Sequence, residues 1–384
     1  MSMVRKPLKV RFLGKPLIPP FRDSSKNLTR DLVLCMDGEN IKPVVFGDRD
    51  VFSQTPWVHV DNCKKRGDDY NRYSSSLIDR LRVLVRLVKP DPDLDLLHAV
   101  FAPTAQTALV TRVLKKIKRI PCVQTLVSRP GKLTRFLLFG DRIIALSKTR
   151  QMELEHLGFH NVVLIRPGII PPAMPGEGDI ARTRNNLKID DGIMILFPGD
   201  LAPFGGWREM LEAHRLVLEK VQSAHLVLAC RKKGRGKADS PEHVRQAVIN
   251  MGIEESVVIL DDEVDDMASL ISASSIVALP AQSLFAKSDA PLVLLEAMAL
   301  KKPVLVSRIP ELLEIVEDGA GLAANTGDPA ALARAMLSVI KSPEQAGMLG
   351  ESAFVKFNRE FSATTMAFRH ESLYQELAAD RSRS

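Results

Sequence analysis

The stretch that decides the fold runs from Leu279 to Gly319 and reads LPAQSLFAKSDAPLVLLEAMALKKPVLVSRIPELLEIVEDG. It predicts a strand that ends at Leu279, a helix over residues 292–300 and a short buried strand over residues 303–307, because an apolar run of strong helix formers is followed by a β-branched run. Strands that alternate with helices in this way are typical of a parallel α/β sheet.

A polar turn at residues 287–291 comes directly before this helix. Pro291 lies near the first helical position, and Ser288 or Asp289 is a candidate cap. A helix that begins in this way directs its free backbone N–H groups and the positive end of its dipole toward the loop. We therefore expect an anion to bind there.

Glu296 lies about one and a half turns into the same helix, on an otherwise apolar segment. An unpaired carboxylate is costly to bury in such surroundings. Glu296 is therefore either a solvated surface side chain or an acceptor for a hydroxyl group of a ligand, and we favour the ligand.

Several stretches resemble one enzyme family. Residues 292–322, LVLLEAMALKKPVLVSRIPELLEIVEDGAGL, are similar to the donor-site signature of the family 4 glycosyltransferases of the GT-B fold. The motif FPGDL at residues 197–201, followed by Gly206, resembles the first strand and glycine turn of their second domain. Residues 139–169 resemble the segment that closes their first domain. The likeness covers about residues 95–320, and it implies two Rossmann-like, doubly wound α/β domains that face a central cleft.

The resemblance also implies how the donor binds. In the family, the glutamate that matches Glu296 holds the ribose of the nucleotide. Glycines after the first strand leave the backbone open to a phosphate, and Arg231 begins a basic run that is either a solvated loop or a source of cations for the cleft. The residues predicted to bind the donor are Glu296, Gly199, Gly205, Gly206, Ala290, Pro291, Leu292 and Arg231.

Four positions depart from the family pattern. Typical members place an Arg and a Lys on the donor diphosphate where this chain has Asp200 and Gly205. A His is replaced by Val127, and the first Glu of the donor motif is replaced by Ser288. We expect Asp289 to replace that Glu through a shift of one residue, which makes Asp289 and Ser288 the catalytic candidates.

The function implied is transfer of a sugar, of the hexosyltransferase type, from a nucleotide-sugar donor to a glycan or lipid-linked acceptor in cell-envelope polysaccharide or glycolipid synthesis. The resemblance implies retention at the anomeric carbon, no obligatory metal and no cofactor besides the nucleotide-sugar substrate. The four departures support an alternative, a non-catalytic GT-B protein that binds a sugar nucleotide or scaffolds a partner enzyme. A sugar-nucleotide epimerase is disfavoured because its several acid and base residues cannot be placed.

Composition is consistent with a cytoplasmic protein that has two sizeable cores. The chain has 384 residues, of which 45% are hydrophobic, and a mean hydropathy of −0.01. Its start, MSMVRKPLKVRFLGK, lacks the apolar core of a secretory signal, and no run of about 18 apolar residues predicts a membrane span. The four cysteines are widely spaced, which favours reduced thiols over disulfides or a metal site.

The predicted domains are separated by a segment rich in proline and glycine. The boundaries are residues 1–165 for the first domain, 166–183 for the linker, 184–360 for the second domain and 361–384 for a helix that crosses back to the first domain. Within the first domain, we expect an irregular loop over residues 48–75 and a helix over residues 77–89.

Positive charge is concentrated in the first half of the chain. Residues 1–180 contain 30 Lys and Arg against 18 Asp and Glu, whereas the remainder contains 23 against 28. One face of a predicted helix over residues 104–118 and its end carries Arg112, Lys115, Lys116 and Arg119. The opposite face, which we expect to be buried, carries Val110, Val113, Leu114 and Ile117.

Two interpretations of this basic face are open. It is either an ordinary solvated face or a surface that docks on an anionic membrane, in which case the protein is peripheral at the inner membrane face. Nucleic acid is not an expected partner, because three Tyr and two Trp offer few aromatic rings for stacking on bases.

Overall fold

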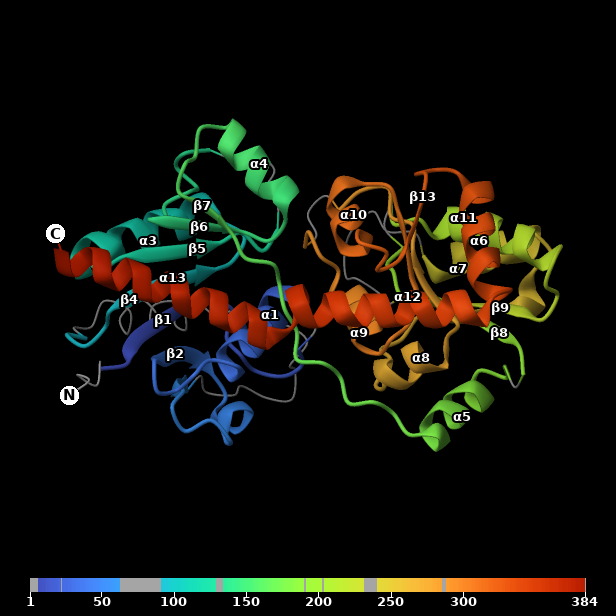
Figure 1. Ribbon diagram of the computed structural model, residues 1–384, viewed down its shortest axis with the longest axis horizontal. Helices are drawn as coiled ribbons and strands as arrows, with labels where there is room; N and C mark the ends of the chain where they lie inside the picture. The colour runs from blue at the N-terminus through green and yellow to red at the C-terminus, as the bar shows by residue number, and fades with distance from the viewer. Residues whose placement is uncertain are drawn as a thin grey trace. The chain divides into compact units, whose positions relative to one another are not determined.

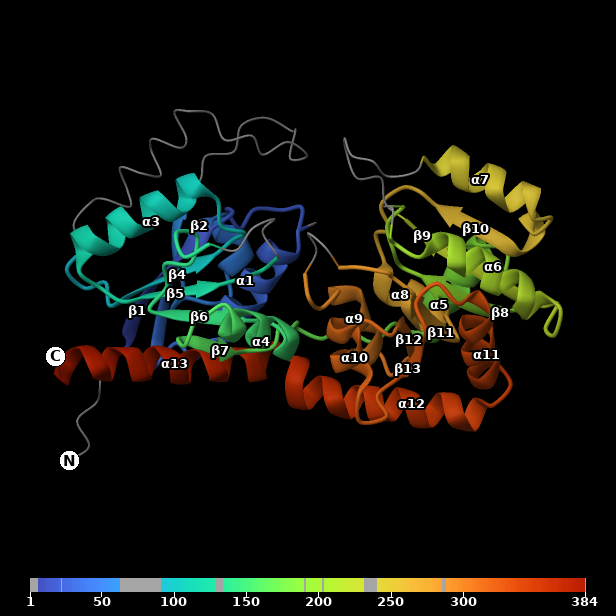
Figure 2. The same ribbon diagram turned by 90° about the horizontal axis from the view of Figure 1, so that it is seen from above.

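A computed structural model describes residues 6–21, 23–62, 91–128, 134–189, 191–201, 204–230, 240–284 and 288–383 (Figures 1 and 2). The chain forms two compact units. Unit 1 comprises Met1–Ile170, Phe285–Asp289 and Ser362–Ser384, and unit 2 comprises Pro171–Leu284 and Ala290–Phe361. The helix expected over residues 77–89 and the candidate Arg231 lie outside the described residues.

Unit 1 contains strands β1 to β7. Their bounds are β1 Leu8–Gly14, β2 Ile41–Gly47, β3 His59–Asn62, β4 Leu96–Val100, β5 Cys122–Thr125, β6 Arg142–Ala145 and β7 Val162–Leu164. The described helices are α1 Ser24–Leu34, the short 3-10 helix η1 Arg49–Phe52, α3 Ala105–Lys118, α4 Lys148–His156 and α13 Ala363–Arg383.

The seven strands form one parallel sheet in the order β3-β2-β1-β4-β5-β6-β7. Because successive side chains of a strand face opposite sides, each strand supplies two cores. Val10 and Leu96 pack with α1 and α13 on one side, while Leu13 and Leu97 pack with α3 on the other. Figures 1 and 2 show α13 running along the sheet of this unit.

Two expectations for unit 1 were wrong. Residues 48–75 were expected to be irregular, and residues 63–75 of this range lie outside the described residues. In the described part, residues 49–52 form η1 and His59–Asn62 forms the edge strand β3, which pairs with β2. The residues of β3 are mostly polar and show no hydrophobic pattern. Only the backbone hydrogen bonds to β2 identify this segment as a strand. Val113 and Ile117 of α3 were expected to be buried, but they are 48% and 56% exposed, because the buried side of α3 consists of Ala108, Thr111 and Leu114.

His98, in the middle of β4, holds α13 to the sheet. Its Nδ1 accepts a hydrogen bond from the Tyr374 hydroxyl at 2.6 Å, and its Nε2 lies 2.7 Å from Oγ1 of Thr125. Burial raises the pKa of Tyr374 well above its usual value, and burial together with the nearby His370 lowers the pKa of His98. The phenol therefore keeps its proton, the imidazole is neutral, and its own proton is donated from Nε2 to Thr125.

Unit 2 contains six strands in a second parallel sheet, ordered β10-β9-β8-β11-β12-β13. The bounds of the strands are β8 Ile193–Phe197, β9 Ala224–Ala229, β10 Val257–Leu260, β11 Ile276–Leu279, β12 Val304–Ser307 and β13 Leu322–Ala324. The predicted fold class, two doubly wound α/β domains, is confirmed.

Helices cover both faces of this sheet. They are α5 Glu177–Asn186, α6 Trp207–Leu218, α7 Pro241–Asn250, η2 Glu254–Ser256, α8 Met267–Ala273, α9 Leu292–Ala299, α10 Pro310–Val316, α11 Pro329–Ile340, α12 Pro343–Lys356 and a π-helical turn η3 Phe357–Phe361. Sequence reasoning did not predict α10 or β13. It also assigned residues 166–183 to a linker, whereas the helix α5 begins at Glu177; α5 has no buried residue within it, so it lacks the apolar stripe that identifies a packed helix.

The hydroxyl of Tyr374 provides a first test of this packing. We expect Tyr374→Phe to lower the free energy of unfolding by about 1–3 kcal/mol, because His98 Nδ1 would lose its only described donor in a fully buried site. Chemical denaturation measures the change, and Phe368→Leu, at a 70% exposed position of the same helix, is the control. Equal stability of both variants would contradict the assignment.

Stability should also depend on pH through His370. Burial lowers the pKa of His370 to about 4 from 6.5, so the unfolded chain binds a proton that the folded chain excludes. The free energy of unfolding is therefore highest above pH 6.5, and about 3 kcal/mol of it is lost as the pH falls from 6.5 to 4. We expect His370→Gln to flatten the dependence of the unfolding midpoint on pH in this range, and His156→Gln, at an exposed position, to leave it unchanged.

Candidate functional site

The strand order of unit 2 indicates where a ligand would bind. From β8, the chain continues to β9 and β10 on one side of the sheet, and to β11, β12 and β13 on the other. Doubly wound sheets bind their ligands outside the carboxyl ends of the strands at such a reversal. The candidate site is therefore bordered by the loops after β8 and β11.

The loops after β8 and β11 contact one another through glycines. Gly206 has a φ of +90°, and a Cβ at this residue would lie 2.3 Å from the carbonyl oxygen of Pro280, which follows β11. A Cβ at Gly199 would meet the ring of Phe197 at 2.3 Å. The backbone N–H of Gln282 also donates to the carbonyl of Phe204 at 2.9 Å. Gly205 is buried beside this contact, and close backbone approach requires a glycine at Gly206.

Helix ends near the crevice are not capped by side chains. The N-caps of α6 and α9 are Gly206 and Pro291, and neither makes a side-chain cap hydrogen bond. By contrast, α7, α8, α11 and α12 of the same unit are capped by Ser240, Asp266, Asp328 and Ser342. The starts of α6 and α9 therefore direct the positive ends of two helix dipoles toward the carboxyl edge of the sheet, a position that favours an anion.

The structure places Glu296 on α9, with Leu295 and Ala297 buried on either side while Glu296 itself is half-buried. Leu292 is the first residue of this helix, and Ala290, just before the Pro291 N-cap, is buried. Four predicted donor-site residues thus lie together at the start of α9, after the carboxyl end of β11.

Ser288 and Asp289 do not cap α9, as the sequence had suggested, because the helix begins after Pro291. Asp289 is 4% exposed and belongs by its contacts to unit 1. Its Oδ2 accepts from the Ser147 hydroxyl at 2.8 Å, and its Oδ1 accepts from Nη2 of Arg150 at 2.9 Å. The Arg150 Nε also lies 3.4 Å from Oδ2, so both carboxylate oxygens are engaged.

Ser147 and Arg150 were not predicted as site residues. Ser147 also caps α4, because its hydroxyl accepts from the backbone N–H of Arg150 at 3.0 Å. Arg150 is 5% exposed and donates to Glu153 as well. The only sequence signal was a hydroxyl at the start of a predicted helix, which ordinarily indicates nothing more than a cap.

The residues that depart from the family pattern have structural surroundings of their own. Val127 is buried in the core of unit 1. Asp200 lies near the buried thiol of Cys230, whose pKa is raised to about 12 chiefly by burial and further by this carboxylate.

Two cations that the sequence did not single out lie at the carboxyl edge of the sheet of unit 2. Arg208 is in the first turn of α6, and the exposed Arg308 directly follows β12.

Neither a metal cluster nor a membrane-spanning helix is found in the part of the chain that the structure describes. Within those residues, His, Cys, Asp and Glu side chains do not gather in threes as ligands for an ion. The helices described there are too short or too polar to cross a bilayer.

Comparison with known proteins connects this crevice to an enzyme family. Residues 192–342, which include β8 to α11, match the family described as glycosyl transferases group 1. The chain is 29% identical over 145 residues to an N-acetyl-alpha-D-glucosaminyl L-malate synthase of Bacillus anthracis, a match that spans 37% of this chain and 37% of that enzyme. It is 23% identical over 316 residues to an uncharacterized glycosyltransferase of Methanocaldococcus jannaschii, with 79% of this chain and 81% of the relative covered.

A solved structure agrees over nearly the whole length. The fold is similar to that of HepE from Anabaena in complex with UDP, with a TM-score of 0.74, 18% identity, and coverage of 97% of this chain and 100% of HepE. HepE has also been solved with UDP-glucose. At this level of identity the likeness establishes the fold.

The buried pair of Asp289 and Arg150 makes a prediction about stability. We expect Asp289→Asn to lower the free energy of unfolding by about 3 kcal/mol, because the buried guanidinium would lose its buried counter-charge. Asp179→Asn, which breaks the exposed pair with Arg182, should cost less than about 1 kcal/mol. Denaturation with urea compares the two variants, and an equal cost would mean that the Asp289 pair contributes no more than a surface pair.

Proposed function

We propose that the chain transfers a hexosyl group from a UDP-sugar to a glycan or lipid-linked acceptor, because residues 192–342 match the group 1 glycosyltransferases and the fold is that of the GT-B enzymes. The observation that carries the proposal is the carboxyl edge of the sheet of unit 2, where the starts of α6 and α9 lack side-chain caps and α9 carries Glu296. Transfer with retention, in cell-envelope polysaccharide or glycolipid synthesis, is part of the same proposal.

Charge and hydrogen-bonding capacity support a position for the donor at the starts of α6 and α9. A nucleoside diphosphate carries its negative charge on the phosphates, which the N–H groups at the starts of α6 and α9 stabilise. Arg208 and Arg308 would supply the positive charge that the family obtains at the positions of Asp200 and Gly205. Glu296 would accept hydrogen bonds from the ribose, and UDP is chosen as the nucleotide because HepE was solved with it.

Asp289 remains a candidate for contact with the donor sugar. Support for this role comes from its position, one residue from the place of the family glutamate, and from the adjoining Ser288. For the sugar to use it, the carboxylate must keep a lone pair beyond those that Arg150 and Ser147 engage, and each carboxylate oxygen has two. Asp289→Asn should then weaken UDP-glucose binding more than UDP binding, and equal effects on the two ligands would leave Asp289 with a structural role alone.

The place of action is proposed to be the cytoplasmic face of a membrane. The chemistry of a lipid-linked acceptor requires such a surface, and α3 presents the predicted basic residues Arg112, Lys116 and Arg119 as exposed side chains. Each basic residue near an anionic surface contributes about 1 kcal/mol, so three give reversible recruitment.

The alternative of a non-catalytic sugar-nucleotide-binding or scaffold protein is favoured by one observation. Asp289, the leading catalytic candidate, is already paired with Arg150 in unit 1. A screen of sugar nucleotides that measures both thermal shift and turnover separates the two functions. Turnover establishes the transferase, whereas binding without turnover with any acceptor supports the alternative.

Glu296 provides the direct test of the donor site. We expect Glu296→Ala to weaken UDP binding by about 1–3 kcal/mol, because a charged hydrogen-bond acceptor for the ribose is lost. Glu344→Ala, at an exposed position in the first turn of α12, is the matched control. Isothermal titration with both variants decides the matter, and unchanged affinity in a folded Glu296→Ala protein would end the claim.

A further inference from the structure

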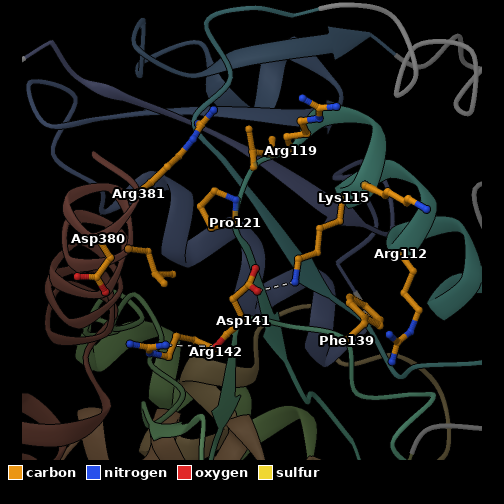
Figure 3. A pocket seen from close by; sticks show the side chains of 12 residues that line it. Arg112, Lys115, Arg119, Pro121, Phe139, Asp141, Arg142, Asp380 and Arg381 are labelled. Atoms are coloured by element: carbon orange, nitrogen blue, oxygen red, sulfur yellow. Dashed lines mark hydrogen bonds and ion pairs between the residues drawn. The ribbon is translucent and has the colours of Figure 1, made fainter. Parts of the chain in front are cut away.

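Unit 1 has a basic pocket at the amino edge of its sheet (Figure 3). Its volume is about 600 Å³. It is lined by the last turns of α3, by the residues that lead into β5 and β6, and by the end of α13. Ligands of doubly wound sheets bind at the carboxyl ends of the strands, so this pocket is separate from the edge at which a transferase substrate binds.

The charge of the pocket is strongly positive. Six Lys and Arg side chains and two Asp side chains line it, which leaves a formal excess of four positive charges. The carboxyl ends of α3 and α13 meet here, and each helix end contributes about −0.5 of a charge. Together they offset about one of the four, and Glu376 neutralises another by pairing with Arg142, so stabilisation of helix ends does not account for the whole cluster.

Some of these cations form ion pairs or hydrogen bonds with residues that surround the pocket. Lys115 pairs with Asp141, which also accepts from the backbone N–H of Cys122 at 2.8 Å. Arg142 pairs with Glu376 at 2.9 Å. Arg112 donates to backbone carbonyls, including that of Arg135 at 2.8 Å. Two of the four residues expected to share a free basic face, Lys115 and Arg112, are thus engaged in internal contacts.

The other three cations are Lys116, Arg119 and Arg381. All three are exposed, and none has an acidic partner among the described residues. They come from two elements far apart in the sequence, and Figure 3 shows Arg119 and Arg381 on opposite sides of Pro121. Because positive charges outnumber negative ones in the lining of this pocket, the cations repel one another unless an anion binds between them.

An apolar stripe lies beside the pocket on the same helix. Leu109, Val113 and Ile117 of α3 are 55%, 48% and 56% exposed, and their spacing of four residues places them along one face. Lys116 lies next to this stripe on the helix surface. An exposed apolar stripe with cations along its border is typical of a helix that lies in the interface of an anionic membrane.

We propose that this pocket binds the phosphate headgroup of an anionic lipid, while the stripe of α3 enters the boundary of the acyl chains. The inference rests on the proposed membrane contact and not on the transfer reaction. In this proposal the protein does not bind the membrane by a diffuse attraction alone. One lipid headgroup binds in a defined site between Lys116, Arg119 and Arg381. The volume is within the range of small-molecule pockets, about 300–1,000 Å³, and so accommodates a glycerophosphate group.

The test uses the full-length protein and vesicles of phosphatidylglycerol in phosphatidylcholine, at about 0.15 M salt, where the Debye length is about 8 Å. We expect Arg119→Glu with Arg381→Glu to lower the fraction of protein bound to vesicles at least tenfold. The matched control, Lys42→Glu with Arg49→Glu, makes the same change in net charge at exposed positions of unit 1 outside the pocket, and it should change binding less than twofold. Arg381→Gln, at the exposed end of the last helix, should weaken binding several-fold without affecting the fold.

A soluble probe distinguishes the source of the phosphate. Glycerol 1-phosphate should compete with vesicles in a saturable manner for the wild type and not for the double variant. Equal losses in the pocket variant and its control would show a diffuse attraction, which overturns the pocket while the membrane contact stands. Saturable binding of glycerol 1-phosphate with no binding to vesicles would overturn the lipid as the source. Glu296→Ala should leave vesicle binding unchanged. The proposed donor site and the proposed lipid pocket are therefore tested independently of one another.

Discussion

The backbone contact between Gly168 and Ser362 constrains the whole chain. A Cβ at Gly168 would lie 2.3 Å from the carbonyl oxygen of Ser362, the two segments form a parallel bridge at Ile169, and the N–H of Ala363 donates to the Ile169 carbonyl at 2.9 Å. The chain leaves unit 1 just after the first segment and returns at the second. Both crossings are therefore fixed beside each other, and α13 begins from that point to run along the first sheet.

Buried polar groups hold this returning helix in one register. His98 accepts from Tyr374 and donates to Thr125, which ties α13 to two adjacent strands. A buried imidazole that lost either partner would carry an unsatisfied polar atom, so the helix cannot slide without a cost. The same burial keeps His98 and His370 uncharged, which links the attachment of α13 to pH.

The two edges of a parallel sheet offer different chemistry, and the proposed donor site and the proposed lipid pocket lie at opposite edges of their sheets. At the carboxyl edge in unit 2, helices begin after the strands, so a diphosphate bound there as proposed would be stabilised by helix N-termini and would need few cations. At the amino edge in unit 1, helix C-termini meet, and an anion can bind only where side-chain cations outweigh the helix dipoles. This explains why the carboxyl edge is rich in glycine, as at Gly199 and Gly206, whereas the amino edge is rich in Lys and Arg, as at Lys116 and Arg119.

The sequence by itself determined the fold class and elements such as the helix over residues 292–300 and the strand over residues 303–307, because runs of strong helix formers and of β-branched residues carry local signals. It also located Glu296 and Gly206, since both belong to a contiguous motif. Only the tertiary structure decided which charged groups are available. Asp289 is paired with Arg150, a residue 139 positions away, and Arg381 reaches the pocket beside Arg119 from the opposite end of the chain. Pairing of charges depends on distance in space, and the spacing of residues along the chain does not encode it.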